Sequence, residues 1–209
     1  SRLDGLGAEG PVLPVRVDVG DAAATADSAL RRALAHPEGY VLRMHGDSVR
    51  IEASTATGAL RGLITLEELA VQREGRLPVG VVADRPAHRT RALHFVLRDV
   101  SIEEARRLVG LARRNQFNML IVQLADGVRL PSIEAVARSD AWSLDQLSRF
   151  AEYARSNGLQ FVPELKLLSQ QGKLLKGHYP ELMYNSETYD PRKEETYEAV
   201  SRVIDDVIG

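Results

Sequence analysis

The feature that most constrains the fold is a strand–helix pattern that repeats along the second part of the chain. The expected strands span residues 89–97, 118–124 and 160–165. Residues 118–124 (NMLIVQL) are nearly all apolar, which predicts a strand buried on both faces. Capped helices are expected after the first two strands, because Ser101 with Glu104 and Ser143 with Gln146 form capping boxes. Such units predict parallel strands joined by right-handed crossovers.

The last third of the chain contains a longer connection before a final helix. Residues 166–189 form this connection, and Asp190-Pro191 predicts the start of a helix that runs to the end, with proline at its first position. About 121 residues follow residue 88, whereas a (β/α)8 barrel needs ~250 residues. The pattern therefore predicts either a small three-stranded α/β sheet or the opening of a longer α/β fold.

Residues 11–86 predict a separate small α+β domain. Its expected order is β-α-β-β-α-β, one sheet with two helices, and Asp84-Arg85-Pro86 marks its end. The expected strands are 11–19, 40–44, 49–53 and 77–82, and the expected helices are 26–35 and 55–72. Within the second helix, Gly58 and Gly62 are expected to pack closely on the sheet.

Residues 1–10 predict a flexible N-terminal segment. They include a G-x-G-x-x-G pattern at Gly5–Gly10. A nucleotide-binding loop of this type needs a strand before it and a helix after it, and here only four residues precede it. The pattern is therefore interpreted as part of the flexible segment.

Composition excludes several classes of function. The chain has no Cys, which removes disulfides and thiol chemistry. A net charge of -2 and 5% aromatic residues argue against nucleic acid as a partner, and no apolar run approaches the ~18 residues of a membrane span. Lys provides only four of the 27 basic residues, which favours a GC-rich bacterial genome. The compartment, cytoplasmic or exported, stays open.

Four stretches, in order, resemble a known enzyme family. They are residues 49–69 (VRIEASTATGALRGLITLEEL), 84–95 (DRPAHRTRALHF), 115–126 (NQFNMLIVQLAD) and the run 142–164 followed by YPEL at 179–182. They are similar to family-20 glycoside hydrolases, the β-N-acetylhexosaminidases. The resemblance implies an α/β architecture, with a small α+β sandwich domain at 11–86 and the first three β/α units of a TIM-type (β/α)8 barrel at 87–209.

The resemblance also implies substrate-binding residues. Arg91 matches an arginine that holds sugar hydroxyls, Asp126 matches the strand-two aspartate, and Glu164 matches the glutamate of the strand-three Pro-Glu pair. His178 lies in the loop that borders the pocket in this family. Other interpretations stay open: Arg91 as a strand-start arginine at the barrel floor, Asp126 as a turn cap with Gly127, and His178 as a solvent-exposed loop residue.

Two further histidine and loop features have simple structural interpretations. His94 lies in mid-strand among apolar residues, which predicts a core histidine with satisfied hydrogen bonds. The loop 170–184 contains Lys173, Lys176 and two tyrosines, and it is either a substrate-contacting loop or a solvated one. No spacing of histidines and carboxylates is typical of a metal site, so neither a metal nor another cofactor is expected.

The implied activity is hydrolysis of terminal N-acetylhexosamine-type glycosides by a retaining, substrate-assisted mechanism. In the family, an Asp-Glu pair at the end of the fourth barrel strand performs this chemistry. That pair is expected beyond residue 209, so no catalytic residue is assigned here and the 209-residue chain alone is expected to be inactive. The expected partner is a carbohydrate, an amino-sugar glycoside.

An alternative is a non-catalytic carbohydrate-binding or interaction module derived from the same fold. Val96, Gln123, Lys166 and Gln170 stand where the family has an Asp, a His, an acid and a His, which favours this alternative. Half a barrel would also leave an open apolar face and unpaired strand edges. We therefore expect a homodimer or further C-terminal chain to cover it.

Overall fold

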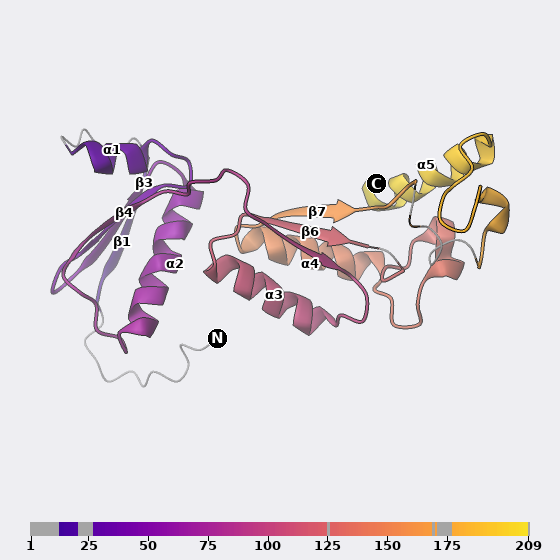
Figure 1. The fold of residues 1–209 in the computed structure, drawn as a ribbon. Coiled ribbons are helices and arrows are strands. Elements are labelled where there is room, and N and C mark those ends of the chain that lie inside the picture. Colours follow the sequence, from indigo (N-terminus) through magenta and orange to yellow (C-terminus); the bar gives the residue numbers. More distant parts are fainter. Residues whose placement is uncertain (1–12, 21–26, 125, 169, 171–176, 209) are drawn as a thin grey trace. The chain divides into compact units, whose positions relative to one another are not determined.

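The computed structural model describes residues 13–20, 27–124, 126–168, 170 and 177–208 (Figure 1). The chain divides into two compact units, residues 1–89 and 90–209. The expected flexible segment 1–10, with its glycine pattern, lies outside the described residues, as do Lys173 and Lys176.

The first unit has the predicted order of strands and helices. Its elements are β1 (Val15–Val19), α1 (Ser28–Leu34), β2 (Tyr40–Met44), β3 (Val49–Ala53), α2 (Ala56–Gln72) and β4 (Gly80–Asp84). The strands form one sheet in the order β1-β3-β2-β4, where β1 is parallel to β3 and the other pairs are antiparallel. The last strand begins three residues later than its predicted start at 77.

Helices α1 and α2 cover opposite faces of this sheet. Alternation along β2 directs Val41 toward α1, whereas Leu42 and its neighbours form the core beneath α2. A Cβ added at Gly62 would lie 2.7 Å from Cγ2 of Ile51, and one at Gly58 would lie 2.4 Å from a backbone oxygen. The predicted close packing of both glycines on the sheet is therefore confirmed.

The second unit is built from parallel strands and helical crossovers, as predicted. Its elements are β5 (Ala92–Val96), α3 (Ile102–Arg114), β6 (Met119–Gln123), the 3-10 helix η2 (Pro131–Val136), α4 (Leu144–Ser156), β7 (Gln160–Glu164), the 3-10 helix η3 (Pro180–Leu182) and α5 (Glu194–Ile208). The sheet order is β5-β6-β7, all parallel. Both predicted capping boxes are present at the starts of α3 and α4.

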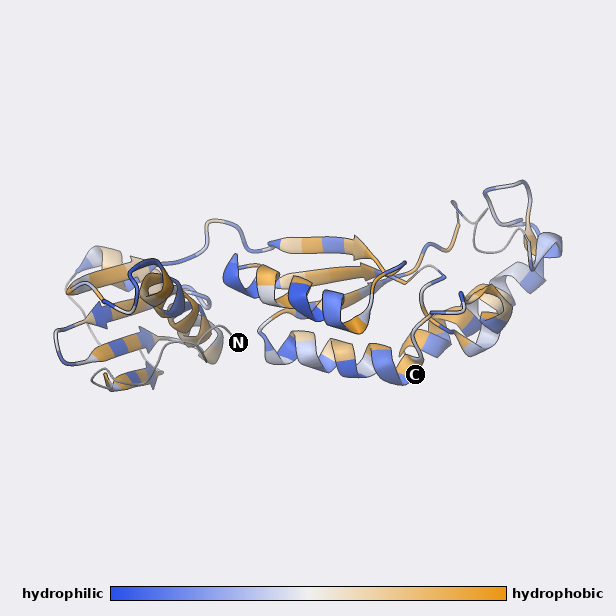
Figure 2. Ribbon diagram, turned by 90° about the horizontal axis from the view of Figure 1, so that it is seen from below, coloured by the Kyte–Doolittle hydropathy of each residue, from blue (hydrophilic) through white to orange (hydrophobic). Residues whose placement is uncertain are grey.

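Among the described residues, helices cover one face of this sheet. In Figure 1, α3 and α4 lie together on the same side of the three strands. Leu120 and Val122 of β6 are fully buried toward this side, and Phe150 of α4 packs edge-to-face on Phe95 and Phe161. Figure 2 shows apolar residues along the strands and alternating polar and apolar residues along the helices.

Strand β6 and the final helix differ from their predictions. Strand β6 is half-exposed at its first, third and fifth residues, because both helices pack on the opposite face. The final helix starts at Glu194 rather than at Pro191, because residues 190–193 form a turn that is closed by the Lys193 N–H donating to the Asp190 carbonyl. In this turn the Asp190 carboxylate accepts hydrogen bonds from the backbone and side chain of Arg192. The 3-10 helices were not predicted.

Among the described residues, none of the helices combines the length and apolar character that crossing a bilayer requires.

Candidate functional site

Two of the predicted site residues lie at the carboxyl edge of the parallel sheet. Glu164 is the last residue of β7 and is aligned with Gln123 of β6, which in turn is aligned with Val96 of β5. Asp126 follows β6 by three residues. In α/β folds the carboxyl ends of parallel strands are where functional groups gather, so this edge is the candidate site.

The face of the sheet that the helices leave open contains a charged pair. Alternation places one set of side chains on this face: His94, Val96, Ile121, Gln123, Val162 and Glu164. Nε2 of His94 lies 2.9 Å from Oε2 of Glu164, with the two side chains 46% and 33% exposed. The prediction of a core histidine at His94 is therefore wrong, because the side chain points away from the packed helices.

Asp126 is held by an arginine from a neighbouring loop. Nε and Nη2 of Arg98, in the loop after β5, both donate to Oδ1 of Asp126, at 2.9 and 2.8 Å. The Asp126 side chain is 16% exposed and that of Arg98 is 31% exposed. A charge-assisted contact of this kind fixes the carboxylate relative to the end of β5.

A second ion-pair cluster joins the loops next to Asp126. Arg138 contacts the carboxylates of Asp99 and Asp140 and donates its backbone N–H to the carbonyl of Asp126. The hydrogen bond between Arg138 and Asp140 raises the pKa of Arg138 and lowers the pKa of Asp140. These contacts hold the loop after β6 in place.

The loop after β6 also fits closely against the end of β5. A Cβ added at Gly127 would lie 1.5 Å from the carbonyl oxygen of Leu97, so only glycine fits there. Trp142, 5% exposed, donates its indole N–H to the carbonyl of Val100 at 3.1 Å, and its backbone N–H bonds to Gly127. These contacts pack Gly127, the residue after Asp126, against the end of β5.

Arg91 and His178 are not brought together with the two carboxylates. Arg91 precedes β5, at the amino end of the sheet, and its Nε donates to the carbonyl oxygen of Gln116 at 2.7 Å. This position matches the interpretation of Arg91 as a strand-start arginine at the barrel floor. His178 is exposed in the turn before η3. The ammonium of Lys166 donates to the side-chain oxygen of Gln170, so these two residues, which differ from the family pattern, contact each other.

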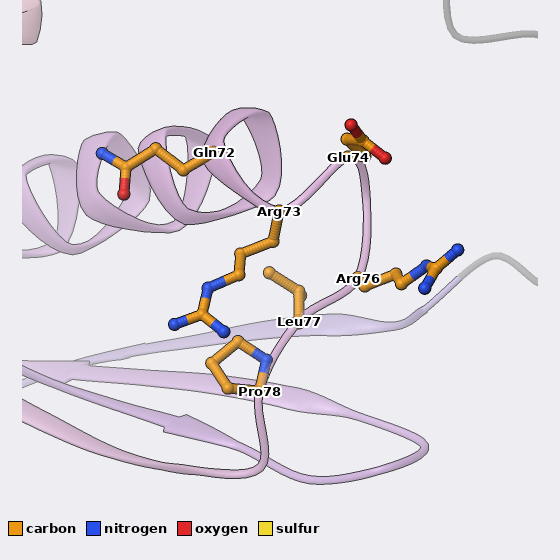
Figure 3. Close-up of a pocket in the computed structure, with 6 residues that line it drawn as sticks. All are labelled: Gln72, Arg73, Glu74, Arg76, Leu77 and Pro78. Carbon is orange, nitrogen blue, oxygen red and sulfur yellow. The ribbon is translucent and has the colours of Figure 1, made fainter.

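A shallow hollow of about 390 Å³ lies elsewhere, in the first unit (Figure 3). It is lined by Gln72, Arg73, Glu74, Arg76, Leu77 and Pro78, where the chain turns after α2. The turn depends on left-handed backbone at Glu74 and Gly75. In Figure 3 the acidic and basic side chains point in different directions, so the hollow presents no converging polar groups and we do not assign it a function.

No metal centre is formed within the part of the chain that the structure describes, because no three His, Asp or Glu side chains converge there.

His94 and Arg98 were not predicted as site residues. For His94 a signal existed: it has the same strand parity as Val96, the family's aspartate position, and that parity puts it on the face of Glu164. For Arg98, no local pattern indicated a partner, since 28 residues separate it from Asp126.

Comparison with known proteins agrees with the family resemblance. Residues 6–85 match the family model described as glycosyl hydrolase family 20, domain 2. The chain is 26% identical over 171 residues to β-hexosaminidase subunit A2 of Dictyostelium discoideum, covering 73% of this chain and 31% of that protein. It is 24% identical over 150 residues to β-hexosaminidase 1 of Coccidioides posadasii, covering 62% of this chain and 24% of that protein.

Solved structures agree on the fold. A crystal structure of a β-N-acetylhexosaminidase superposes with a TM-score of 0.77 at 19% identity, covering 93% of this chain and 47% of the other. Streptomyces plicatus N-acetyl-β-hexosaminidase, in complex with Thio-NAglucal, superposes with a TM-score of 0.72 at 20% identity, covering 91% and 44%. The predicted fold class is thereby confirmed.

The chain spans about a quarter to a third of the length of the curated relatives it matches. Those relatives come from a fungus and an amoeba, so they give the predicted bacterial origin no support.

Proposed function

We propose that this chain, with its domain 2 of glycosyl hydrolase family 20, forms part of a glycosidase. The proposal takes the chain as a divergent relative of the β-hexosaminidases. The proposed substrates are glycosides with a terminal N-acetylhexosamine. The match of residues 6–85 carries the proposal. The carboxylates of Asp126 and Glu164 support it, because both belong to the sheet edge where barrel enzymes bind substrate.

The proposed mechanism is retaining and substrate-assisted. A general acid protonates the leaving oxygen while the substrate's own acetamido oxygen attacks the anomeric carbon. We assign sugar-hydroxyl contacts to Asp126 and Glu164, since ionised carboxylates accept hydrogen bonds from hydroxyl groups. Contacts from Arg91 and His178 remain predictions from the resemblance.

The 209 residues contain no adjacent Asp-Glu pair. We therefore propose that a polypeptide of these residues alone does not hydrolyse glycosides. The protein expressed from its complete coding sequence is the proper test, assayed with 4-nitrophenyl N-acetyl-β-D-glucosaminide beside the 209-residue polypeptide. Turnover by the former alone is expected, and turnover by the pure 209-residue polypeptide would contradict the assignment.

Glu164→Gln provides the site-specific test. We expect kcat/KM to fall by about 10- to 100-fold, the loss typical of a hydrogen bond to a charged group. Glu152→Gln is the matched control, since Glu152 is an exposed glutamate on α4 and its replacement should leave turnover unchanged. Equal activities of the two variants would remove Glu164 from the proposed site.

The alternative function is a non-catalytic carbohydrate-binding module. Val96, Gln123, Lys166 and Gln170 favour it, because they replace the ionisable groups of the family pattern with residues of different charge. It predicts that N-acetylglucosamine binds without turnover of any glycoside. Isothermal titration on the protein that fails the hydrolysis assay distinguishes this function from no sugar function at all.

We also propose that a second copy or further chain covers the open face of the β5-β6-β7 sheet. Half-exposed Ile121 and Val162 and exposed Val96 line that face, and exposed apolar area costs about 25 cal/mol per Å². Sedimentation velocity of the 209-residue polypeptide should show a dimer or larger species. A stable monomer that binds no hydrophobic dye would contradict this proposal.

A further inference from the structure

The His94–Glu164 contact spans the width of the second sheet. His94 of β5 is aligned with Ile121 of β6, which is aligned with Val162 of β7. Glu164 lies two residues further along β7, on the same face. The side chains therefore reach over β6 and meet with Nε2 of His94 2.9 Å from Oε2 of Glu164.

The pair lies in mostly aliphatic surroundings. Its neighbours on the open face are Val96, Ile121 and Val162, which offer no hydrogen bond, and Gln123, which carries the one other polar side chain named on this face. Among the described residues, His94 is the ion-pair partner of the Glu164 carboxylate. The imidazole contacts Oε2, and the other oxygen, Oε1, is not part of this contact.

We propose that His94 is a positioning residue for Glu164. By holding Oε2, His94 fixes the carboxylate so that Oε1 accepts a hydrogen bond from a sugar hydroxyl. The proposal deepens the sugar-binding role of Glu164 and so rests on the proposed function. It assigns to His94 a role in which the imidazole acts through the carboxylate and does not touch the sugar.

The physical reason is the cost of ordering a flexible side chain. A glutamate that is free to change rotamers loses that freedom when it binds a ligand, and the loss reduces affinity. A glutamate already held by His94 avoids most of this loss. Gln123, aligned with Glu164 on the same face, adds an amide that can both donate to and accept from a neighbouring hydroxyl.

A double-mutant cycle tests the proposal. It uses the protein from its complete coding sequence and compares wild type, His94→Leu, Glu164→Gln and the double variant. His94→Gln is the conservative variant, because its amide nitrogen can take the place of Nε2. His45→Leu, at an exposed turn residue of the first unit, is the control. Thermal unfolding first confirms that each variant is folded.

We expect His94→Leu to lower kcat/KM by about tenfold, through KM rather than kcat, because a pre-positioned hydroxyl contact serves ground and transition state alike. His94→Gln should recover activity to within about threefold of wild type, since it restores a donor to the carboxylate. The double variant should be no worse than Glu164→Gln, because His94 acts only through that carboxylate. The proposal would be overturned if the kcat/KM losses of His94→Leu and Glu164→Gln multiply in the double variant. It would also be overturned if His94→Gln has a kcat/KM as low as that of His94→Leu.

If wild type hydrolyses no glycoside, the enzymatic function fails but the positioning role is still tested. The same variants are then titrated with N-acetylglucosamine. The same pattern in Kd, with coupled losses and recovery by His94→Gln, supports the role of His94. Independent losses or absence of binding would overturn it.

Discussion

Replacing Arg98 by methionine tests whether the loop that presents Asp126 depends on the ion pair. Methionine keeps much of the aliphatic volume of arginine but removes both donors to Oδ1, at 2.9 and 2.8 Å. The Asp126 carboxylate, 16% exposed, would then lack its charged partner while largely shielded from water.

The expected loss in free energy of unfolding follows from how exposed the side chains of Arg98 and Asp126 are. Exposed pairs contribute about 0.2–1 kcal/mol, whereas breaking a buried pair costs about 3–5 kcal/mol. Arg98 and Asp126 lie between these limits, at 31% and 16% exposed. We therefore expect Arg98→Met to lower the free energy of unfolding of the second unit by about 2 kcal/mol.

Urea denaturation followed by tryptophan fluorescence measures this loss. Trp142 is the sole tryptophan in the chain, and it hydrogen-bonds to Val100 and Gly127, in the two loops that the ion pair joins. Arg138→Met is the matched control, because its pairs with Asp99 and Asp140 are more exposed and it should cost less than half as much. The reasoning is refuted if Arg98→Met costs no more than this control.

Three further predictions concern the second unit. Phe150→Ala should destabilise it by about 3–5 kcal/mol and Phe150→Leu by clearly less, measured by the same urea denaturation, because Phe150 is 1% exposed and packs on three aromatic rings. Gly127→Ala should abolish cooperative unfolding or displace the Asp126 loop, since its Cβ would lie 1.5 Å from a carbonyl oxygen; an unchanged unfolding midpoint would contradict this. The hydrogen bond from Arg192 lowers the pKa of Asp190 from 3.8 to about 2, so its stabilising contribution is present above pH 4 and is lost as pH falls toward 2. Asp190→Asn should remove that part of the pH dependence of unfolding, and an identical profile for both proteins would show that Asp190 does not contribute.

Features that depend on neighbours along the chain could be predicted from sequence. The capping boxes Ser101–Glu104 and Ser143–Gln146 each close within a single helical turn, so the residues that make the structure are those that signal it. The short apolar runs likewise predicted the strands of the second sheet, and their repetition with helices between them predicted that these strands are parallel. The start of α5 was missed because Asp190 and Pro191 belong to a turn before the helix, closed by the Lys193 N–H donating to the Asp190 carbonyl.

The contacts that make the candidate site depend on tertiary structure. Sequence predicted that Asp126 and Glu164 would follow strand ends, because a strand end is a local feature. It did not predict that Arg98 holds Asp126 or that His94 meets Glu164 across β6. Those contacts depend on which strands are adjacent, on the register between them, and on which face of the sheet the helices cover. The paired residues are 28 or more positions apart in the sequence, so they meet only when the sheet assembles.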